Sequence, residues 1–438
     1  MTLENISDSR KTLLRGWLLL AIASLALAGL FAILLVLSRI PGMENSVPWP
    51  AAFFHKGLVA HVVLSFVVWF LAILGCLVQI GSIEDSKLLD KVGLFFAIIG
   101  TILLLIPALL DRGEPTLNNY IPIIIDPLYY SGLIILAFGM LLSIFPVFKK
   151  QYIGPNLKGP GIIYIISIIA FIVAAGQLSG EPVNYDYNES LIWGGGHILQ
   201  CLNVILLLVS WSYLSDQIKS NLPFKVATFW LVSTSLIGLS FYLIWDVTDE
   251  TQAGAFTHLQ KTLGPPVLIF FIILIPTIGK QLSNFKWQDP AMLSLWTSIF
   301  VFTVGGILGG FVDGTDTRTP AHYHGVIGGI NLAFVGLFYT IFLPMLNRGI
   351  IASKLIACQI ILYASGQLLF IIGMFVAGGM GASRKVMGTS IDMDSLIAIS
   401  AARIRDFGGG IAIIGGVLFI YIALKALLGQ SRSKYRFE

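Results

Sequence analysis

Long apolar runs separated by short polar segments dominate this sequence. Each run carries few charges and is long enough for a helix to cross a bilayer core of about 30 Å. Backbone groups inside lipid must pair within their own segment, so such runs predict helices. The pattern predicts twelve spanning helices over residues 14–38, 52–80, 91–110, 121–147, 160–177, 190–213, 225–246, 262–280, 290–311, 320–346, 354–379 and 406–428.

Composition supports a membrane protein. Hydrophobic residues make up 56% of the chain and charged residues 11%, and the mean hydropathy is +0.86. A water-soluble domain carries about 25% charged residues, so this chain lacks the charge to cover a water-facing surface. A net charge of +4 spread along the chain does not indicate nucleic-acid binding. We therefore expect an all-α polytopic membrane protein in which residues 1–438 form a single transmembrane domain.

The distribution of positive charge predicts the orientation in the membrane. With twelve spans both termini lie on the same side. If that side is the cytoplasm, 18 of the 27 Lys and Arg residues fall in inner loops and ends, and the inner loops are the shorter ones. The positive-inside rule then favours cytoplasmic termini. We expect a multi-pass protein of the bacterial inner membrane.

Four of the six histidines fall at one predicted depth. His61 lies in the second span, His197 in the sixth, and His322 and His324 open the tenth. All three spans run from outside to inside, which places these residues about 5–15 Å below the outer surface. Ionisable groups within a membrane are costly and often functional. The alternative for any one of them is a helix–helix hydrogen bond.

The spacing of His322 and His324 suggests two cofactors. Residues two apart on a helix point about 200° apart, so these imidazoles cannot easily bind one metal but can bind two, on opposite sides of the helix. Imidazole suits iron, and ligation by one or two histidines is ordinary for haem. Glycines at 194–196 and near 325 leave room beside the histidines, either for flat cofactors or for close helix packing.

These patterns resemble subunit I of the haem-copper oxidase superfamily, which includes respiratory oxidases and nitric oxide reductases. The resemblance covers the whole chain in topology, and it rests on Ala60-His61 and on Ala321-His322-Tyr323-His324. It implies two haems: a low-spin haem held by His61 and His324, and a high-spin haem held by His322. It also implies that Arg384 and Lys385 hold haem propionates.

The resemblance assigns a third metal, copper or non-haem iron, to His197, and here the sequence departs from the family pattern. The two adjacent histidines expected at the end of the seventh span are missing. Asp249 and Glu250, or Asp246, are the candidate replacements; the alternatives are no third metal and a solvated loop. The tyrosine expected four residues after His197 is Cys201. Tyr242 is the alternative redox tyrosine.

Three functions follow from these observations. The first is a catalytic subunit that takes electrons from an outer-side cytochrome c or redox subunit and reduces oxygen or nitric oxide. The second is a haem electron-transfer or gas-sensing membrane protein that has lost the binuclear metal. The third is a twelve-helix secondary transporter, for which midplane charges are scarce. We expect lipid and a redox partner around the chain, and no nucleic acid.

Overall fold

The structure is a computed structural model, and it describes residues 6–37, 53–82, 86–149, 157–215, 221–272, 286–312, 314–348, 353–384 and 395–429. Within these ranges, eleven helical segments are long and apolar enough to cross a membrane. Residues 264–272, inside the predicted eighth span, are helical too, and residues 273–280 of that span lie outside the described residues. The predicted all-α membrane fold of about twelve helices is confirmed.

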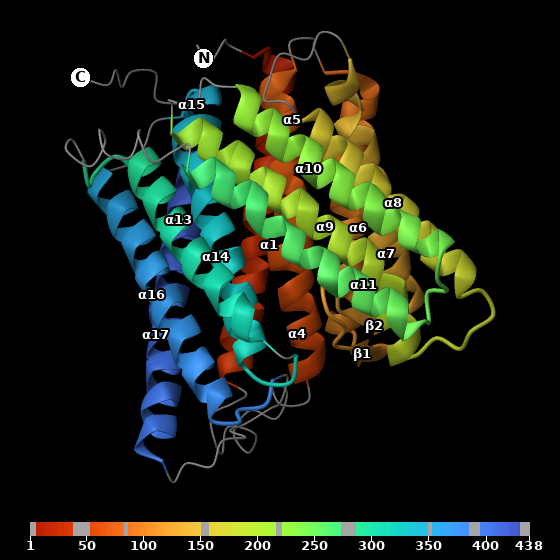
Figure 1. The fold of residues 1–438 in the computed structure, drawn as a ribbon. Helices are drawn as coiled ribbons and strands as arrows, with labels where there is room; N and C mark the ends of the chain where they lie inside the picture. The colour runs from red at the N-terminus through yellow and green to blue at the C-terminus, as the bar shows by residue number, and fades with distance from the viewer. Residues whose placement is uncertain are drawn as a thin grey trace. The chain divides into compact units, whose positions relative to one another are not determined.

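The elements follow one another as Figure 1 shows. The first half comprises α1 (Asp8–Leu37), α4 (Phe54–Val62), π-helical η1 (Val63–Val68), α5 (Trp69–Gly81), α6 (Leu88–Leu109), β1 (Glu114–Thr116), β2 (Ile123–Ile125), α7 (Pro127–Ile144), η2 (Phe145–Phe148), α8 (Lys158–Gln177) and α9 (Tyr185–Leu214). The second half comprises α10 (Asn221–Ser240), η3 (Phe241–Leu243), α11 (Glu250–Gln260), η4 (Lys261–Leu263), α13 (Pro290–Leu308), η5 (Gly309–Phe311), α14 (Arg318–Leu337), π-helical η6 (Phe338–Phe342), α15 (Leu343–Met345), α16 (Ser353–Gly379) and α17 (Leu396–Leu428).

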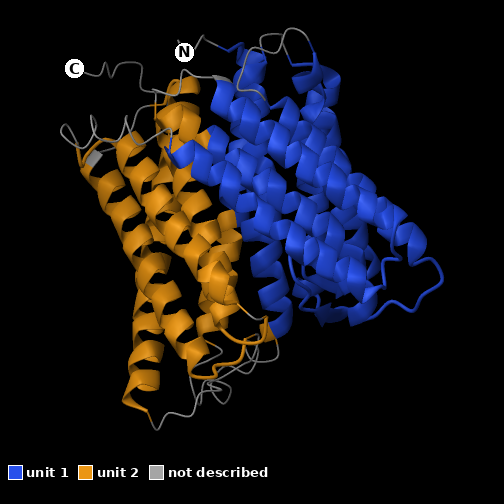
Figure 2. Cartoon of the chain, in the orientation of Figure 1, with its two compact units in different colours: residues 1–24, 55–209, 217–283 blue, residues 25–54, 210–216, 284–438 orange. Residues whose placement is uncertain are grey.

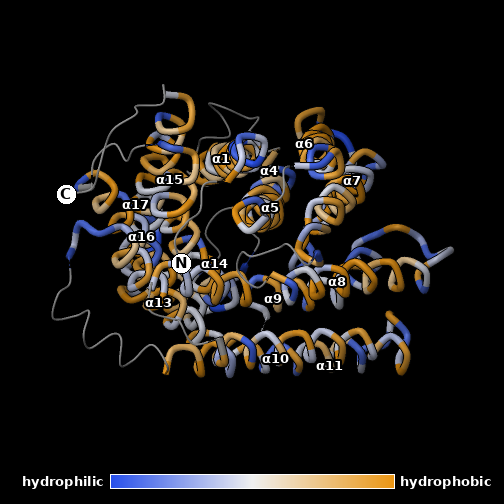
Figure 3. Tube along the Cα trace, turned by 90° about the horizontal axis from the view of Figure 1, so that it is seen from above, coloured by the Kyte–Doolittle hydropathy of each residue, from blue (hydrophilic) through white to orange (hydrophobic). Residues whose placement is uncertain are grey.

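The chain groups into two compact units, which Figure 2 colours separately. Unit 1 comprises residues 1–24, 55–209 and 217–283, and unit 2 comprises residues 25–54, 210–216 and 284–438. Figure 3 shows apolar residues along the helices of both units. The expectation of one transmembrane domain stays a prediction.

The three spans that carry the predicted histidine ligands are the most enclosed. In their most apolar stretches, 72% of residues are buried in Phe54–Gly81, 83% in Tyr185–Leu214 and 78% in Arg318–Met345, against 33–50% in the other eight. A helix that is apolar all round and buried all round is an inner helix, because a lipid-facing helix exposes one side. The histidines therefore lie on inner helices of the protein.

A buried ion pair joins three helices of unit 1. The Arg10 guanidinium on α1 lies 3.1 Å from the Asp90 carboxylate on α6, and it donates to the Gln79 side-chain oxygen on α5 at 2.8 Å. All three side chains are buried.

In unit 2, the glycines of α16 and α17 let the two backbones approach closely, as at Gly366 and Gly415. Small residues at such contacts are typical of helix packing in membranes.

Several helix starts differ from the prediction, and those of α7 and α17 are described here. The fourth span begins at Pro127 rather than at residue 121, because residues 123–125 form strand β2 and Asp126 caps the helix by accepting from the Leu128 N–H at 2.8 Å. The Asp126 carboxylate also lies 3.0 Å from Arg112. Helix α17 begins at Leu396 rather than at 406, and its 33 residues give a length of about 50 Å, so it exceeds the bilayer core.

Candidate functional site

His322 is held in an orientation that suits a metal ligand. It lies on the first turns of α14, half-buried, and its Nδ1 donates to the Gly305 carbonyl on α13 at 2.8 Å. A carbonyl only accepts, so Nδ1 carries a proton, and in the neutral ring Nε2 keeps the lone pair. Histidines that bind metals commonly have one nitrogen fixed in this way. The residues around His322 therefore fit a haem ligated through Nε2.

Glycines on α13 and η5 make this orientation possible. A Cβ on Gly309 would lie 2.6 Å from two ring atoms of His322, so only glycine leaves space for the imidazole. At Gly305 a Cβ would lie 2.5 Å from the backbone of Gly325, which shows how closely α13 and α14 approach. The glycines near residue 325 thus serve close helix packing as well as the space beside His322.

His324 faces a different helix from His322. Its ring stands perpendicular to that of Phe370 on α16, with 5.1 Å between centroids, and it also contacts the neighbouring Tyr323. His324 is half-buried. His322 therefore points towards α13 and His324 towards α16, as their two-residue spacing predicted. One inner helix can present them to two separate cofactors.

His61 lies in unit 1, on the last turn of α4 and directly before the π-helical segment η1. It is half-buried, and its backbone carbonyl accepts from the Ser65 hydroxyl at 2.7 Å. π-helical turns inside membrane helices often mark functional positions. Because His61 belongs to unit 1 and His324 to unit 2, their shared ligation of one haem stays a prediction.

The predicted basic residues follow α16. Arg384 is half-buried, and Lys385 lies outside the described residues. The backbone just before Arg384 is tied to the start of α14, because the Thr317 N–H donates to the Ala382 carbonyl at 2.9 Å and Asp316 bridges to Ser383. Arg384 thus lies on a loop that is attached to the N-terminal end of the helix that carries His322.

His197 has both ring nitrogens engaged within unit 1. Its Nδ1 donates to the Trp193 carbonyl one turn earlier on α9 at 2.7 Å, and its Nε2 lies 2.9 Å from the Tyr120 hydroxyl. Because Nδ1 carries the proton, Nε2 of the neutral ring accepts from Tyr120. Aromatic rings of Tyr120, Trp193 and Phe256 surround the imidazole at centroid distances of 4.5–5.6 Å.

Aromatic side chains occupy the space beside the three glycines that precede His197. A Cβ at Gly196 would lie 2.8 Å from Tyr120, and Cβ atoms at Gly194 and Gly195 would contact Tyr242 and Phe171. Between the two sequence-based alternatives, room for a cofactor or close packing, the structure shows close packing at this segment. Tyr242 reaches the same aromatic cluster through Phe256, at a centroid distance of 5.8 Å.

The candidate carboxylate ligands of a third metal form local structure instead. Asp249 caps α11 by accepting from the Thr251 N–H at 2.7 Å, and Glu250 is exposed. Asp246 accepts from the backbone and hydroxyl of Thr248, and these hydrogen bonds lower the pKa of the Asp246 carboxyl. Among the described residues, no three His, Cys, Asp or Glu side chains gather as a metal would require. These residues do not fit a third metal.

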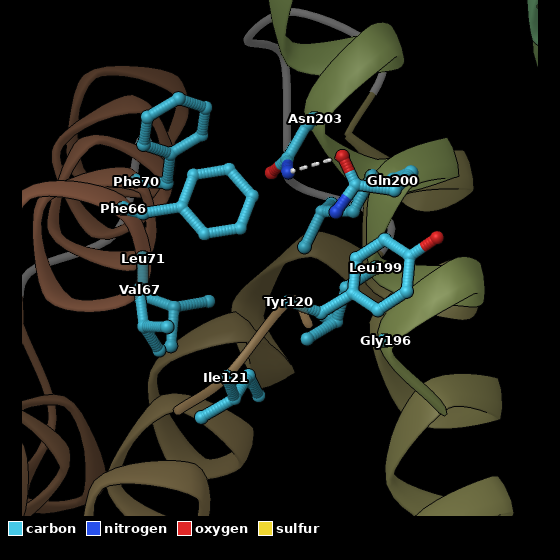
Figure 4. Close-up of a pocket in the computed structure, with 11 residues that line it drawn as sticks. Phe66, Val67, Phe70, Leu71, Tyr120, Ile121, Gly196, Leu199, Gln200 and Asn203 are labelled. Carbon is cyan, nitrogen blue, oxygen red and sulfur yellow. Dashed lines mark hydrogen bonds between the residues drawn. The ribbon is translucent and has the colours of Figure 1, made fainter. Parts of the chain in front are cut away.

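A cavity lies beside the Tyr120 ring in unit 1. Figure 4 shows it between the η1–α5 segment and α9, with Phe66, Leu199, Gln200 and Asn203 among its walls. The lining is mostly apolar, and the Asn203 amide donates to the Gln200 oxygen at 3.4 Å. The Tyr120 side chain thus lines the cavity with its ring and forms a hydrogen bond to His197 with its hydroxyl.

Sequence reasoning missed three of these residues. Gly305 and Gly309 lie four residues apart in the ninth predicted span, which was the available signal that one helix face there is free of side chains. Nothing near Tyr120 in the sequence indicated a partner for His197, because the contact joins segments 77 residues apart. A buried imidazole needs partners for both nitrogens, but the sequence does not show which loop supplies them.

A comparison with models of protein families shows to which family the chain belongs. The family model described as cytochrome C and Quinol oxidase polypeptide I matches residues 12–411. The chain belongs to this family. The resemblance inferred from the histidine pattern is therefore confirmed, and the chain is a divergent, multi-pass membrane member with a terminal oxidase-like fold.

Similar proteins agree with this placement. The chain is 26% identical to the uncharacterised protein RP382 of Rickettsia prowazekii (strain Madrid E) over 508 aligned positions, covering 98% of each protein. It is 29% identical to an uncharacterised protein of Aquifex aeolicus (strain VF5) over 336 positions, covering 74% of this chain and 83% of the relative. A cryo-EM structure of a heme-copper terminal oxidase dimer matches with a TM-score of 0.78 at 17% identity, over 98% of this chain and 86% of that one, which shows a shared fold.

Proposed function

We propose that this chain is a haem-carrying oxidoreductase of the inner membrane, with cytoplasmic termini, that takes electrons from an outer-side cytochrome c or redox subunit. The observation that carries the proposal is the pair of imidazoles on α14, with His322 towards α13 and His324 towards α16. In this proposal His61 and His324 hold a low-spin haem, and His322 holds a high-spin haem. Bound haem iron supplies electron transfer at the first position, and binding and reduction of oxygen or nitric oxide at the second.

The protein's own residues position these groups. The Gly305 carbonyl fixes the His322 ring through Nδ1, which leaves Nε2 as the atom that would bind the haem iron. Arg384, and in this proposal Lys385, neutralise propionate carboxylates beside the outer end of α14, since guanidinium pairs well with carboxylates. Tyr242 remains a candidate redox residue on the ground of its place in the aromatic cluster around His197.

A second function has specific support. Both nitrogens of His197 are engaged, and the carboxylates of Asp249 and Glu250 lie in a helix cap and at the surface. A family member without the binuclear metal would transfer electrons or sense a gas rather than reduce it. Membership of the oxidase family favours both haem functions over a transporter.

The test is haem content and a reduced-minus-oxidised spectrum of purified wild-type and variant proteins. We expect two haems per chain. His61→Ala and His324→Ala should each remove the low-spin signal and keep the other, and His322→Ala should remove the high-spin signal. His55→Ala is the matched control, because His55 is exposed on the same helix as His61. An unchanged low-spin spectrum in both single variants would refute the assignment, and protein without haem would refute the function.

A further inference from the structure

The tip of the β1–β2 hairpin inserts a tyrosine into the His197 pocket. Strands β1 and β2 pair antiparallel, and the loop at residues 117–122 joins them. Tyr120 stands at the apex of this loop with φ +66°, and the Ile121 N–H donates to the Asn119 carbonyl at 2.9 Å across it. A γ-turn with positive φ is rare and strained, most of all for a bulky residue. Such a conformation persists only when surrounding contacts hold it.

Glu189 on α9 supplies those contacts. Its carboxylate accepts from the Asn118 side chain at 2.8 Å, from the Asn119 side chain at 2.7 Å and from the Asn119 backbone N–H at 3.2 Å. From the other side, the Tyr129 hydroxyl donates to the Pro122 carbonyl at 2.7 Å. The turn is thus fixed at both ends, and Glu189 holds the residues directly before Tyr120.

The pocket is shaped to receive the phenol. Gly196 leaves the space that the Tyr120 ring fills, and the hydroxyl reaches Nε2 of His197 at 2.9 Å. Burial, with a further contribution from the negative charge of Glu189, raises the pKa of Tyr120. Tyr120 therefore stays a protonated donor at ordinary pH, and the imidazole nitrogen opposite it is an acceptor.

We propose that the His197 pocket is a metal-free phenol–imidazole site, in which Tyr120 takes the position that a metal ion would need on Nε2 and Glu189 acts as its positioning residue. The donor set leaves no lone pair of His197 free for a metal, since Nδ1 is protonated and Nε2 accepts from Tyr120. This inference goes beyond the proposed function and depends only on unit 1. It holds whether or not the haems are present.

The test combines elemental analysis with nitrogen NMR of ¹⁵N-histidine-labelled protein in lipid vesicles. Cells are grown with added copper and iron, and the six histidines keep the spectrum tractable. Signals of His197 are assigned by their loss in His197→Gln. We expect one protonated nitrogen and one bare, hydrogen-bonded nitrogen at His197, with no copper or non-haem iron that disappears in His197→Gln.

The variants separate positioning from general structure. Tyr120→Phe should move the Nε2 signal to that of a bare nitrogen without a hydrogen bond, and leave Nδ1 unchanged. Glu189→Gln, which places an amide donor against the asparagine donors, should produce the same change, and Glu189→Asp should restore part of the wild-type signal. Asp186→Ala, an exposed acid one turn earlier on α9, is the control and should change nothing.

Two results would overturn the inference. One is a metal bound at one equivalent per chain that is lost in His197→Gln. The other is an Nε2 signal that stays the same in Tyr120→Phe. A preparation that lacks haem but shows the expected His197 signals would refute the proposed function and support this inference, so the two failures are distinguishable.

Discussion

Gly309 offers the sharpest test of how His322 is positioned. Replacing it with alanine adds one methyl group that would lie 2.6 Å from Cε1 and Nδ1 of the His322 ring, whereas ordinary contact begins at 3.4 Å. The backbone at Gly309 has φ −59°, which alanine adopts without strain. Gly309→Ala therefore perturbs the imidazole rather than the fold.

The size of the effect follows from the hydrogen bond that His322 Nδ1, one of the two contacted ring atoms, donates to the Gly305 carbonyl. To relieve the contact, the ring must move by about 0.8 Å, the difference between 2.6 and 3.4 Å. A movement of that size along the bond would stretch the 2.8 Å contact with Gly305 to about 3.6 Å, beyond hydrogen-bond length. Loss of such a supporting bond commonly costs about 10–100-fold in metal affinity, or about 1.4–2.8 kcal/mol.

The assay is the carbon monoxide difference spectrum, which reports a high-spin haem with an open position, together with haem titration of haem-depleted protein. Gly309→Ala should lower high-spin haem affinity by that factor and leave the low-spin signal unchanged. Gly310→Ala is the control, because no atom lies within 4 Å of its added methyl group. Wild-type carbon monoxide binding in Gly309→Ala, or an equal loss in Gly310→Ala, would show that Gly309 does not position the His322 ring.

Three further predictions concern stability and the third-metal candidates. Arg10→Ala should destabilise the protein by about 3–5 kcal/mol in detergent unfolding, because it leaves the Asp90 carboxylate buried without its ion pair, and Arg10→Met with Asp90→Leu should recover most of the loss. Gly366→Ala should cost about 1–3 kcal/mol by forcing α16 and α17 apart, while Gly416→Ala, with open space around it, should not. Asp249→Asn should keep the helix cap, the metal content and the haem spectra, whereas Asp249→Ala should cost about 1 kcal/mol of stability; metal loss in Asp249→Asn would restore a ligand role.

Most of the fold could be predicted from the sequence, because lipid leaves few structures open to a long apolar run. The ends of helices were harder, since they depend on local polar contacts. Asp126 and Pro127 end a hairpin and begin α7, although the apolar residues before them continue the hydropathy signal of the helix. At Leu396 the helix starts well before the apolar stretch that suggested it.

The candidate site, too, could be predicted only in part from the sequence. That His322 and His324 face different helices follows from helical geometry and could be predicted from their two-residue spacing. The partners of each imidazole could not, because they come from other helices and loops. Gly305 lies on the preceding helix, and Tyr120 comes from a hairpin tip whose conformation depends on Glu189. Such contacts depend on tertiary packing and leave no local pattern in the sequence.

The partners of each histidine decide what it can bind. His322 and His197 are both neutral imidazoles on inner helices, and each donates Nδ1–H to a backbone carbonyl. They differ at Nε2, which in His197 already accepts from Tyr120. Because a neutral imidazole has one lone pair to give, this single hydrogen bond separates a ring that fits a metal from one that does not. A change at Tyr120 is therefore the smallest change that would bring the His197 pocket towards the metal-binding pattern of its family.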